Sequence, residues 1–249
     1  MSTDAGIMLR RNVKHTLRSP VALFNAILMP IVLMLMFVYV FGDAFNVGAG
    51  VNYIDYATPG MLMMTLGYGV GATATAVNSD MTKGIINRFK VMDVSRGAVL
   101  TGHVVSTVVR TVLALAAVLG VAFLMGFSPQ ATAGQWLALT GVLVLATVAI
   151  GWLTIALGMA AKTVESAGFA TVPLVMLPFF SSAIVPAEKM GPGVRQFAEY
   201  QPFTSIIESV RGYLAGTPST GHTIAAVAWC VGLALVGHLW ARSTFTRRA

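Results

Sequence analysis

The sequence contains little charge and almost no cysteine. Only 10% of its 249 residues are Asp, Glu, Lys or Arg, whereas 56% are hydrophobic and the mean hydropathy is +0.78. A soluble domain of this length needs far more charge to cover its surface, so the composition predicts an integral membrane protein. The single cysteine, Cys230, lies in an apolar run, which excludes a disulfide framework and a cysteine-based metal site.

Sequence motifs for phosphate binding and hydrolysis are also missing. No G-x-x-x-x-G-K-[ST] loop occurs, and the nearest string, Gly158 to Thr163, has Ala161 where the second glycine belongs. All nine acids, from Asp4 to Glu208, fall in predicted loops or flanks, so no predicted span carries a carboxylate relay for protons. No H-E-x-x-H or G-x-S-x-G motif is present. The chain is therefore predicted to be no enzyme, to hold no cofactor or metal, and to draw its energy from a partner.

Six apolar stretches are present, and each is long enough to predict a membrane span. The first would be about 32 Å long at a rise of about 1.5 Å per residue. Residues 1–20 carry leucines at helical spacing among arginines, which predicts an interfacial helix or, alternatively, a plain basic flank. Arg110, near the inner end of the third span, is expected to extend its charge to the membrane surface. The predicted spans are 21–41, 57–78, 104–125, 135–160, 168–185 and 222–240.

The net charge of +7 is distributed unevenly along the chain. The cations cluster in the N-terminal segment, in the loop 79–101, at Lys162 and at the C-terminus, whereas the segments on the other side hold only Lys189, Arg195 and Arg211. Such an asymmetry marks the cytoplasmic side of a multi-pass membrane protein, so both termini are predicted to be cytoplasmic. The same distribution argues against nucleic acid as the partner. The first apolar run is too long for a signal peptide and no clear cleavage site follows it.

The inner loop 79–101 carries an amphipathic pattern. Met81, Ile85, Phe89 and Met92 recur at spacings of three or four residues, which predicts a short helix with one apolar face. That face would either lie on the bilayer or insert into a soluble partner.

The segment from the fifth span to the sixth has the most informative pattern. Two prolines, Pro173 and Pro178, interrupt the fifth span, and residues 186–220 then predict two short helices that are broken at Pro202. Pairs at helical spacing are expected to form ion pairs, and an apolar face is expected on the second helix. The segment predicts a re-entrant hairpin that acts as a lid or gate; a capping loop without a role in transport is the alternative. The pairs are Arg195 with Glu199 and Glu208 with Arg211, and the face is Phe203, Ile206, Ile207, Val210 and Tyr213.

A family resemblance rests on this segment. The pattern P-x4-P-x7-P, followed by P-G-V-R-Q-F-A-E-Y-Q-P-F-T and by Glu208 and Arg211, resembles the C-terminal signature of type-2 ABC export permeases, in particular the daunorubicin-resistance branch. The spacing of the apolar stretches extends the resemblance over nearly the whole chain. It implies a pair of permeases, identical or different, each bound to a cytoplasmic ATP-binding subunit that holds ATP and Mg²⁺.

The resemblance also implies roles for particular residues. A route between the two permeases would be lined by the first, second and fifth spans, and the loop 79–101 would couple them to the ATPase. The implied route residues are Phe24, Asn25, Tyr68 and Phe180; the coupling residues are Ile85, Arg88, Phe89 and Met92; and the outer gate is Phe197, Pro202 and Phe203.

Two classes of function therefore remain. The favoured class is ATP-driven export of amphipathic drugs or lipid-like metabolites across a bacterial plasma membrane, with export of lipid-linked glycans as the alternative within transport. The other class is a membrane scaffold or sensor that transports nothing.

Overall fold

The computed structural model describes residues 20–45, 47, 50–82 and 96–248. All regular structure in these ranges is helical, so the predicted all-α class is confirmed. The predicted interfacial helix, up to residue 19, and the coupling residues Ile85, Arg88, Phe89 and Met92 lie outside the described residues.

The described helices divide into long, membrane-sized helices and shorter apolar or connecting ones. Four are long and apolar enough to cross a membrane: α3, residues Thr101–Leu124 of α5, α6, and residues Thr220–Thr246 of α11. Two shorter apolar stretches accompany them, Ile27–Val40 and Val164–Phe180. In chain order the elements are α2 (Pro20–Leu35), η1 (Met36–Val40), η2 (Gly42–Ala44), α3 (Tyr53–Thr82), α5 (Arg96–Leu124), α6 (Ala133–Ala160), α7 (Val164–Ala170), α8 (Val172–Met176), η3 (Leu177–Phe180), η4 (Ala187–Lys189), α9 (Val194–Tyr200), α10 (Pro202–Leu214) and α11 (Thr220–Arg248).

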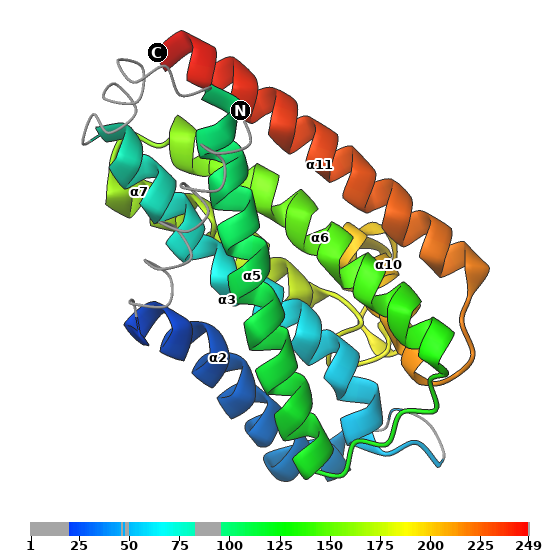
Figure 1. Ribbon diagram of the computed structural model, residues 1–249. Helices are drawn as coiled ribbons and strands as arrows, with labels where there is room; N and C mark the ends of the chain where they lie inside the picture. Colours follow the sequence, from blue (N-terminus) through cyan, green and yellow to red (C-terminus); the bar gives the residue numbers. More distant parts are fainter. Residues whose placement is uncertain (1–19, 46, 48–49, 83–95, 249) are drawn as a thin grey trace.

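Helix α3 forms the centre of the bundle. It contacts α2, α5, α6, α7, α8 and α10, whereas α11 packs mainly along α6 at one edge and α2 lies at the opposite edge (Figure 1). Of the most apolar window of α3, 72% is buried, against 22% for α11. The long helices run side by side along the molecule, and α10 lies against α3, α6 and α11.

Small residues allow this close packing. A Cβ on Gly158 of α6 would lie 2.5 Å from the backbone oxygen of Ala74 on α3, so the two backbones are in direct contact. Gly67 and Gly71 of α3 face α8 and Thr171 at looser distances: their Cβ atoms would lie 3.4 Å from the Leu174 carbonyl oxygen and 3.6 Å from the Thr171 hydroxyl. Because these positions carry no side chain, the helix backbones can approach each other closely at these points.

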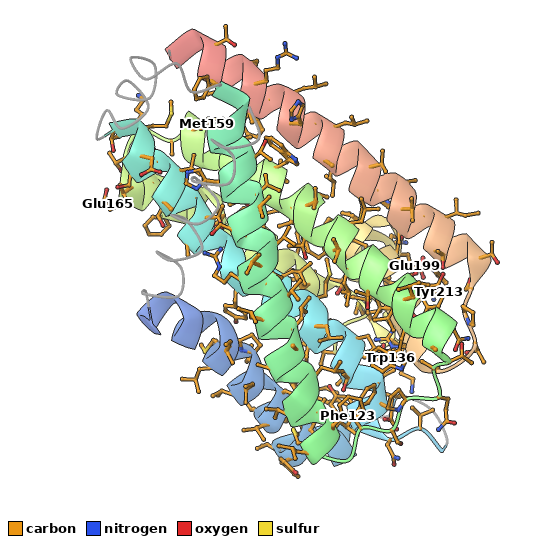
Figure 2. The ribbon with its side chains drawn as sticks, in the orientation of Figure 1. Phe123, Trp136, Met159, Glu165, Glu199 and Tyr213 are labelled. Atoms are coloured by element: carbon orange, nitrogen blue, oxygen red, sulfur yellow. The ribbon has the colours of Figure 1, made fainter. Side chains whose placement is uncertain are left out.

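The two ends of the bundle differ in composition. Glu165 and Met159 lie at the end where α6 passes into α7, and Phe123 and Trp136 lie at the other end, where α5 passes into α6 (Figure 2). The Phe123 and Trp136 rings are 6.5 Å apart. Tryptophan is enriched where a membrane meets water.

Arg110 does not extend to a membrane surface, so that prediction was wrong. Its side chain is only 7% exposed and donates a hydrogen bond to the Gly69 carbonyl of α3 at 2.7 Å. Burial against a neighbouring helix gives the guanidinium hydrogen-bond acceptors that lipid would not provide.

Candidate functional site

The fifth apolar segment is broken into three short pieces. α7 ends at Ala170, α8 begins after Thr171, and the chain tightens into the 3-10 helix η3 before it leaves helical geometry at Ser181. Proline has no backbone N–H, so Pro173 and Pro178 each remove one hydrogen bond from a continuous helix. The Thr171 hydroxyl satisfies one of the carbonyls at the break by donating to Gly168 at 2.7 Å. The segment therefore ends in an irregular turn, residues 181–186, whose backbone needs partners from elsewhere.

Two tyrosines at the start of α3 supply part of what this turn needs. The Tyr56 hydroxyl donates to the Ser182 carbonyl at 3.0 Å, and the Tyr53 hydroxyl donates to the Ile184 carbonyl at 3.2 Å. Both tyrosines are buried. The start of α3 is thus tied to the turn that follows the broken segment.

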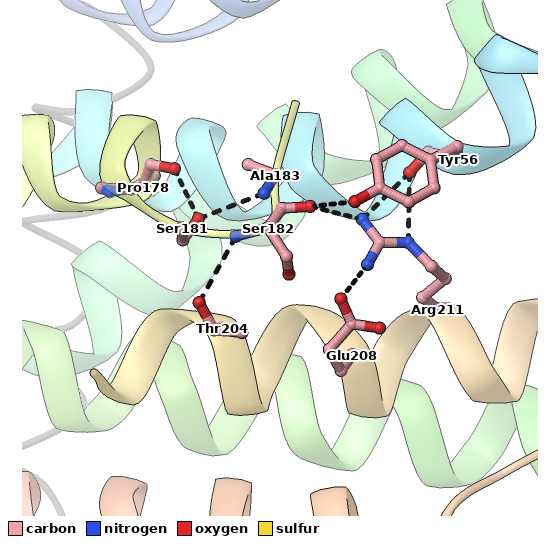
Figure 3. Close-up of polar contacts among 8 residues, drawn as sticks. All are labelled: Tyr56, Pro178, Ser181, Ser182, Ala183, Thr204, Glu208 and Arg211. Atoms are coloured by element: carbon pink, nitrogen blue, oxygen red, sulfur yellow. Dashed lines mark hydrogen bonds and ion pairs between the residues drawn. The ribbon is translucent and has the colours of Figure 1, made fainter. Parts of the chain in front are cut away.

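Arg211 of α10 is bonded to both of these elements (Figure 3). Its Nη2 donates to the Ser182 carbonyl at 2.7 Å, and its Nη2 and Nε donate to the Tyr56 carbonyl at 3.2 and 3.3 Å. Its Nη1 pairs with the Glu208 carboxylate, and its Cζ lies 3.8 Å from the centre of the Tyr56 ring. One guanidinium therefore joins α3, the turn and α10.

Gln201, between α9 and α10, binds the end of the broken segment. Its Nε2 donates to the carbonyls of Leu177 and Phe180 at 3.3 and 3.1 Å. The buried Oε1 of Gln201 and the buried Oγ of Ser182 have no hydrogen-bond partner within the described residues. The Ser182 N–H, in contrast, donates to the Thr204 hydroxyl of α10 at 3.3 Å.

Backbone contact completes this arrangement. A Cβ on Gly60 of α3 would lie 2.3 Å from the carbonyl oxygen of Ala183, so the turn rests directly on the α3 backbone. We call the whole set the outer closure, after the outer side on which the sequence predicts this segment to lie. It comprises Tyr53, Tyr56, Gly60, Ser182, Ala183, Gln201, Thr204, Glu208 and Arg211.

A string of aromatic rings leads from the first apolar segment to the outer closure. Phe41, Phe37, Phe45, Tyr53 and Tyr56 follow one another at ring spacings of 5.4 to 6.5 Å, and Arg211 lies over the last ring. The string begins at the π-helical turn η1, a rare geometry that occurs often at functional sites. A cleft of about 470 Å³ opens beside it, lined by Val38, Gly42, Phe45, Val47, Val51, Asn52, Tyr53, Ile54, Met125 and Gly126.

The broken segment also presents an exposed apolar face. Phe169, Val172, Met176 and Phe180 recur every three or four residues, and their side chains are 76%, 45%, 40% and 50% exposed. This face belongs to the same segment that the outer closure holds in place.

Comparison with known proteins identifies the family. The family model described as "ABC-2 type transporter" matches residues 3–215. The chain belongs to the ABC-2 type transporter family. It is 30% identical over 220 residues, which are 87% of this chain and 74% of the relative, to the daunorubicin resistance ABC transporter permease protein DrrB1 of Streptomyces coeruleorubidus. It is 25% identical over 225 residues, 88% of this chain and 79% of the relative, to the probable doxorubicin resistance ABC transporter permease protein DrrC of Mycobacterium tuberculosis.

Membership of the ABC-2 family makes the chain a multi-pass membrane permease of an ABC transporter, a class whose ATP site is on a separate subunit. The predicted resemblance is thereby confirmed.

Among the described residues, no group of three or more His, Cys, Asp or Glu side chains could hold a metal ion.

The structure places the predicted route residues of this ABC-2 permease as follows. Tyr68 is half-buried on α3, and Phe180 is half-exposed at the end of η3. Phe24 and Asn25 lie on α2, but their side chains are outside the described residues.

Two of the three predicted gate residues lie in or beside the outer closure. Phe203 is 2% exposed and Pro202 begins α10, next to Gln201 and Thr204. Phe197 lies on α9 and is half-exposed. Both predicted ion pairs of the hairpin are confirmed, and Glu199 raises the pKa of Arg195 by accepting its hydrogen bond.

Sequence reasoning missed most of the outer closure. It expected Arg211 to pair with Glu208, but it gave no sign that Tyr56, 155 positions earlier, and the Ser182 carbonyl share the same guanidinium. Gln201 and Tyr53 were not singled out at all. The available signal was the broken segment itself, because an irregular backbone inside a membrane protein requires nearby donors.

Proposed function

We propose that this ABC-2 permease is the membrane subunit of an ATP-driven exporter of amphipathic drugs or lipid-like metabolites. Its similarity to the permeases DrrB1 and DrrC, which are named for daunorubicin and doxorubicin resistance, supports this proposal most directly. The apolar exposed face of the broken segment and the aromatic string suit an amphipathic substrate better than a small ion.

The energy comes from a cytoplasmic ATP-binding subunit with its ATP and Mg²⁺. The permease carries no phosphate loop of its own. We propose that Ile85, Arg88, Phe89 and Met92 bind that subunit and pass its movement to the adjoining helices α3 and α5.

Six spans are proposed for the membrane, with the two shorter apolar stretches completing the four long helices. The helical path Pro20–Val40 measures about 32 Å at about 1.5 Å per residue, enough to cross. Lys162 and Arg242 then lie on the inner side together with both termini and the interfacial helix 1–20, as the positive-inside rule requires in a bacterial plasma membrane. A cysteine at Ser128 should react with an impermeant thiol reagent in intact cells, whereas one at Lys162 should react only after permeabilisation.

Two copies, or this chain and a related permease, are proposed to face each other across the broken segment. The exposed side chains Phe169, Val172, Met176 and Phe180 would then line the route together with Tyr68, Phe24 and Asn25. The hairpin 186–220 re-enters the membrane from outside, and the outer closure holds it across the outer end of this route. Transport requires the hairpin to separate from the turn that follows the broken segment.

Two alternatives make different predictions. Export of lipid-linked glycans uses the same plan but would require a much wider route and a glycan substrate. A scaffold or sensor would move nothing. Neighbouring genes for glycosyltransferases would favour the first alternative.

Reconstitution tests the proposal directly. The permease and its ATP-binding subunit are placed in proteoliposomes, and accumulation of a fluorescent anthracycline is followed after addition of ATP. We expect accumulation that needs ATP, Mg²⁺ and a hydrolysis-competent subunit. Absence of movement of any amphipathic probe, with ATP hydrolysis intact, would support the scaffold instead.

A further inference from the structure

Helices α3 and α5 are joined by polar contacts at three successive levels. At the inner end, His103 Nε2 lies 3.2 Å from the Asp80 carboxylate. One level deeper, the hydroxyls of Thr73 and Thr107 are 2.9 Å apart. Deepest of all, Arg110 reaches α3, and we call this set the α3–α5 seam: Gly69, Thr73 and Asp80 on α3 with His103, Thr107 and Arg110 on α5.

Arg110 holds the deepest level with two hydrogen bonds from a single nitrogen. Its Nη2 donates to the Gly69 carbonyl at 2.7 Å and to the Thr73 hydroxyl at 2.6 Å. Its buried Nε has no partner within the described residues, and no described Asp or Glu forms an ion pair with it. Arg110 lies nine residues beyond Thr101, about 14 Å into the apolar stretch. A cation at that depth is costly, which marks the position as functional.

The hydrogen bonds of the seam share one direction. The Thr107 hydroxyl donates its only proton to the His103 carbonyl at 2.9 Å. Thr73 must therefore donate to Thr107, and its oxygen is left to accept from Arg110. The hydrogen bonds thus run from Arg110 to Thr73, from Thr73 to Thr107 and from Thr107 to the His103 carbonyl. A slide of α5 along α3 would lengthen the bonds that Thr73 and Gly69 make with α5, whereas the Thr107–His103 bond, which lies within α5, would persist.

The seam joins the two helices that are connected to the proposed coupling loop. α3 ends at Thr82 and α5 begins at Arg96, so both helices are joined directly to residues 83–95, the core of the proposed coupling loop. Helices that slid past each other would absorb a movement of that loop. Asn78, at the same end of α3, donates to the carbonyls of Gly158 and Ala161 and extends the connection to α6.

We propose that the α3–α5 seam joins the two helices into one rigid lever, with Arg110, Thr73 and Thr107 as positioning residues for transport. The lever carries movement of the coupling loop toward the outer closure, which α3 reaches through Tyr53, Tyr56 and Gly60. This inference rests on the proposed function. The seam contributes no contact to the substrate, so its loss changes the drug moved per ATP hydrolysed rather than drug binding.

A covalent replacement of the seam tests the proposal. Thr73→Cys and Thr107→Cys are combined in a Cys230→Ala background, reconstituted with the ATP-binding subunit, and assayed for anthracycline transport before and after oxidation. We expect the oxidised protein to transport at least as well as the reduced one, because the disulfide takes over the role of the hydrogen bond. Loss of transport on oxidation that a reductant restores would show that the helices must slide, and would overturn the lever. If the disulfide did not form, Thr73 and Thr107 would not be neighbours, and the proposal would be overturned.

Valine substitutions provide the matched measurement. Thr73→Val removes two interhelical bonds, to Thr107 and from Arg110, whereas Thr147→Val removes a hydroxyl that is equally buried but bonds only within its own helix, to Leu143. Loss of a single hydrogen bond costs about 1 kcal/mol, a factor of about five, so we expect loss of both bonds in Thr73→Val to lower the drug moved per ATP at least about fivefold. Thr147→Val should leave that ratio unchanged. Equal effects of the two variants, or an unchanged ratio in both, would contradict the lever.

The result also separates the two proposals. If the wild-type protein moved no drug, the proposed function would fail, and the seam would be judged on permease-dependent ATP hydrolysis. In that assay the oxidised double-cysteine protein should hydrolyse ATP at least as fast as the reduced protein. A reversible loss of ATP hydrolysis on oxidation would reject the lever independently of the proposed function.

Discussion

The guanidinium of Arg211 lies 3.8 Å from the centre of the Tyr56 ring and donates hydrogen bonds to the carbonyl of that same residue. The tyrosine is thus held from two sides, while its own hydroxyl donates to the Ser182 carbonyl that Arg211 also binds. Three parts of the chain that are far apart in sequence meet at this pair. We regard it as the centre of the outer closure.

Arg211→Met should destabilise the permease. The change leaves the carbonyls of Tyr56 and Ser182 without their charged donor and leaves Glu208 without its partner. Hydrogen bonds to charged groups are worth about 1.5–3 kcal/mol, so we expect the free energy of unfolding to fall by about 3 kcal/mol. Thermal unfolding in detergent measures the effect. Arg195→Met is the control, because that arginine pairs with Glu199 on an exposed surface, and its loss should leave the melting temperature unchanged.

Gly60→Ala should separate α3 from the turn that follows the broken segment. The added methyl group would lie 2.3 Å from the Ala183 carbonyl oxygen, and backbone on both sides leaves no side chain to move aside. Overpacking of this kind costs about 1–3 kcal/mol. Gly120→Ala, on α5, meets nothing within 4 Å and should be neutral or slightly stabilising. If both variants unfolded at the wild-type temperature, the close contact at Gly60 would be wrong.

Cysteines on the exposed apolar face should link two permeases. Phe169→Cys, Met176→Cys and Phe180→Cys, each in a Cys230→Ala background, are oxidised in membranes and separated on non-reducing gels. We expect at least one of them to form a dimer when the transporter contains two copies of this chain. Leu235→Cys on α11 is the control, because its side chain is also exposed but lies on a different helix, at the edge of the bundle where α11 packs along α6. If only Leu235→Cys formed dimers, the second permease would contact α11 and not the broken segment, which would contradict this prediction.

Local patterns in the sequence predicted the local features of the structure. The pairs Arg195 with Glu199 and Glu208 with Arg211 follow from helical spacing alone, and both form. The apolar face of α10 follows from the same periodicity, with Phe203, Ile206, Ile207 and Val210 buried.

Features that depend on distant parts of the chain could not be predicted in this way. Arg110 was expected to extend toward the membrane surface because it lies near the inner end of the predicted third span. Its acceptors, Gly69 and Thr73, lie 41 and 37 positions earlier on α3. The same limit applies to Tyr56 and Gln201, whose partners are backbone carbonyls of a turn that exists only because the fifth segment is broken. Residue types alone do not reveal which carbonyls a fold leaves unpaired.

The central claim, that the outer closure must open for export, is tested most directly by locking it. Ser182→Cys and Thr204→Cys are combined in the Cys230→Ala background, because the Ser182 N–H and the Thr204 hydroxyl are already 3.3 Å apart. Reconstituted with the ATP-binding subunit, the reduced protein should export anthracycline. Oxidation should lower transport at least about tenfold, which corresponds to about 1.4 kcal/mol, and a reductant should restore it. Transport by the oxidised protein at the reduced rate would contradict the account.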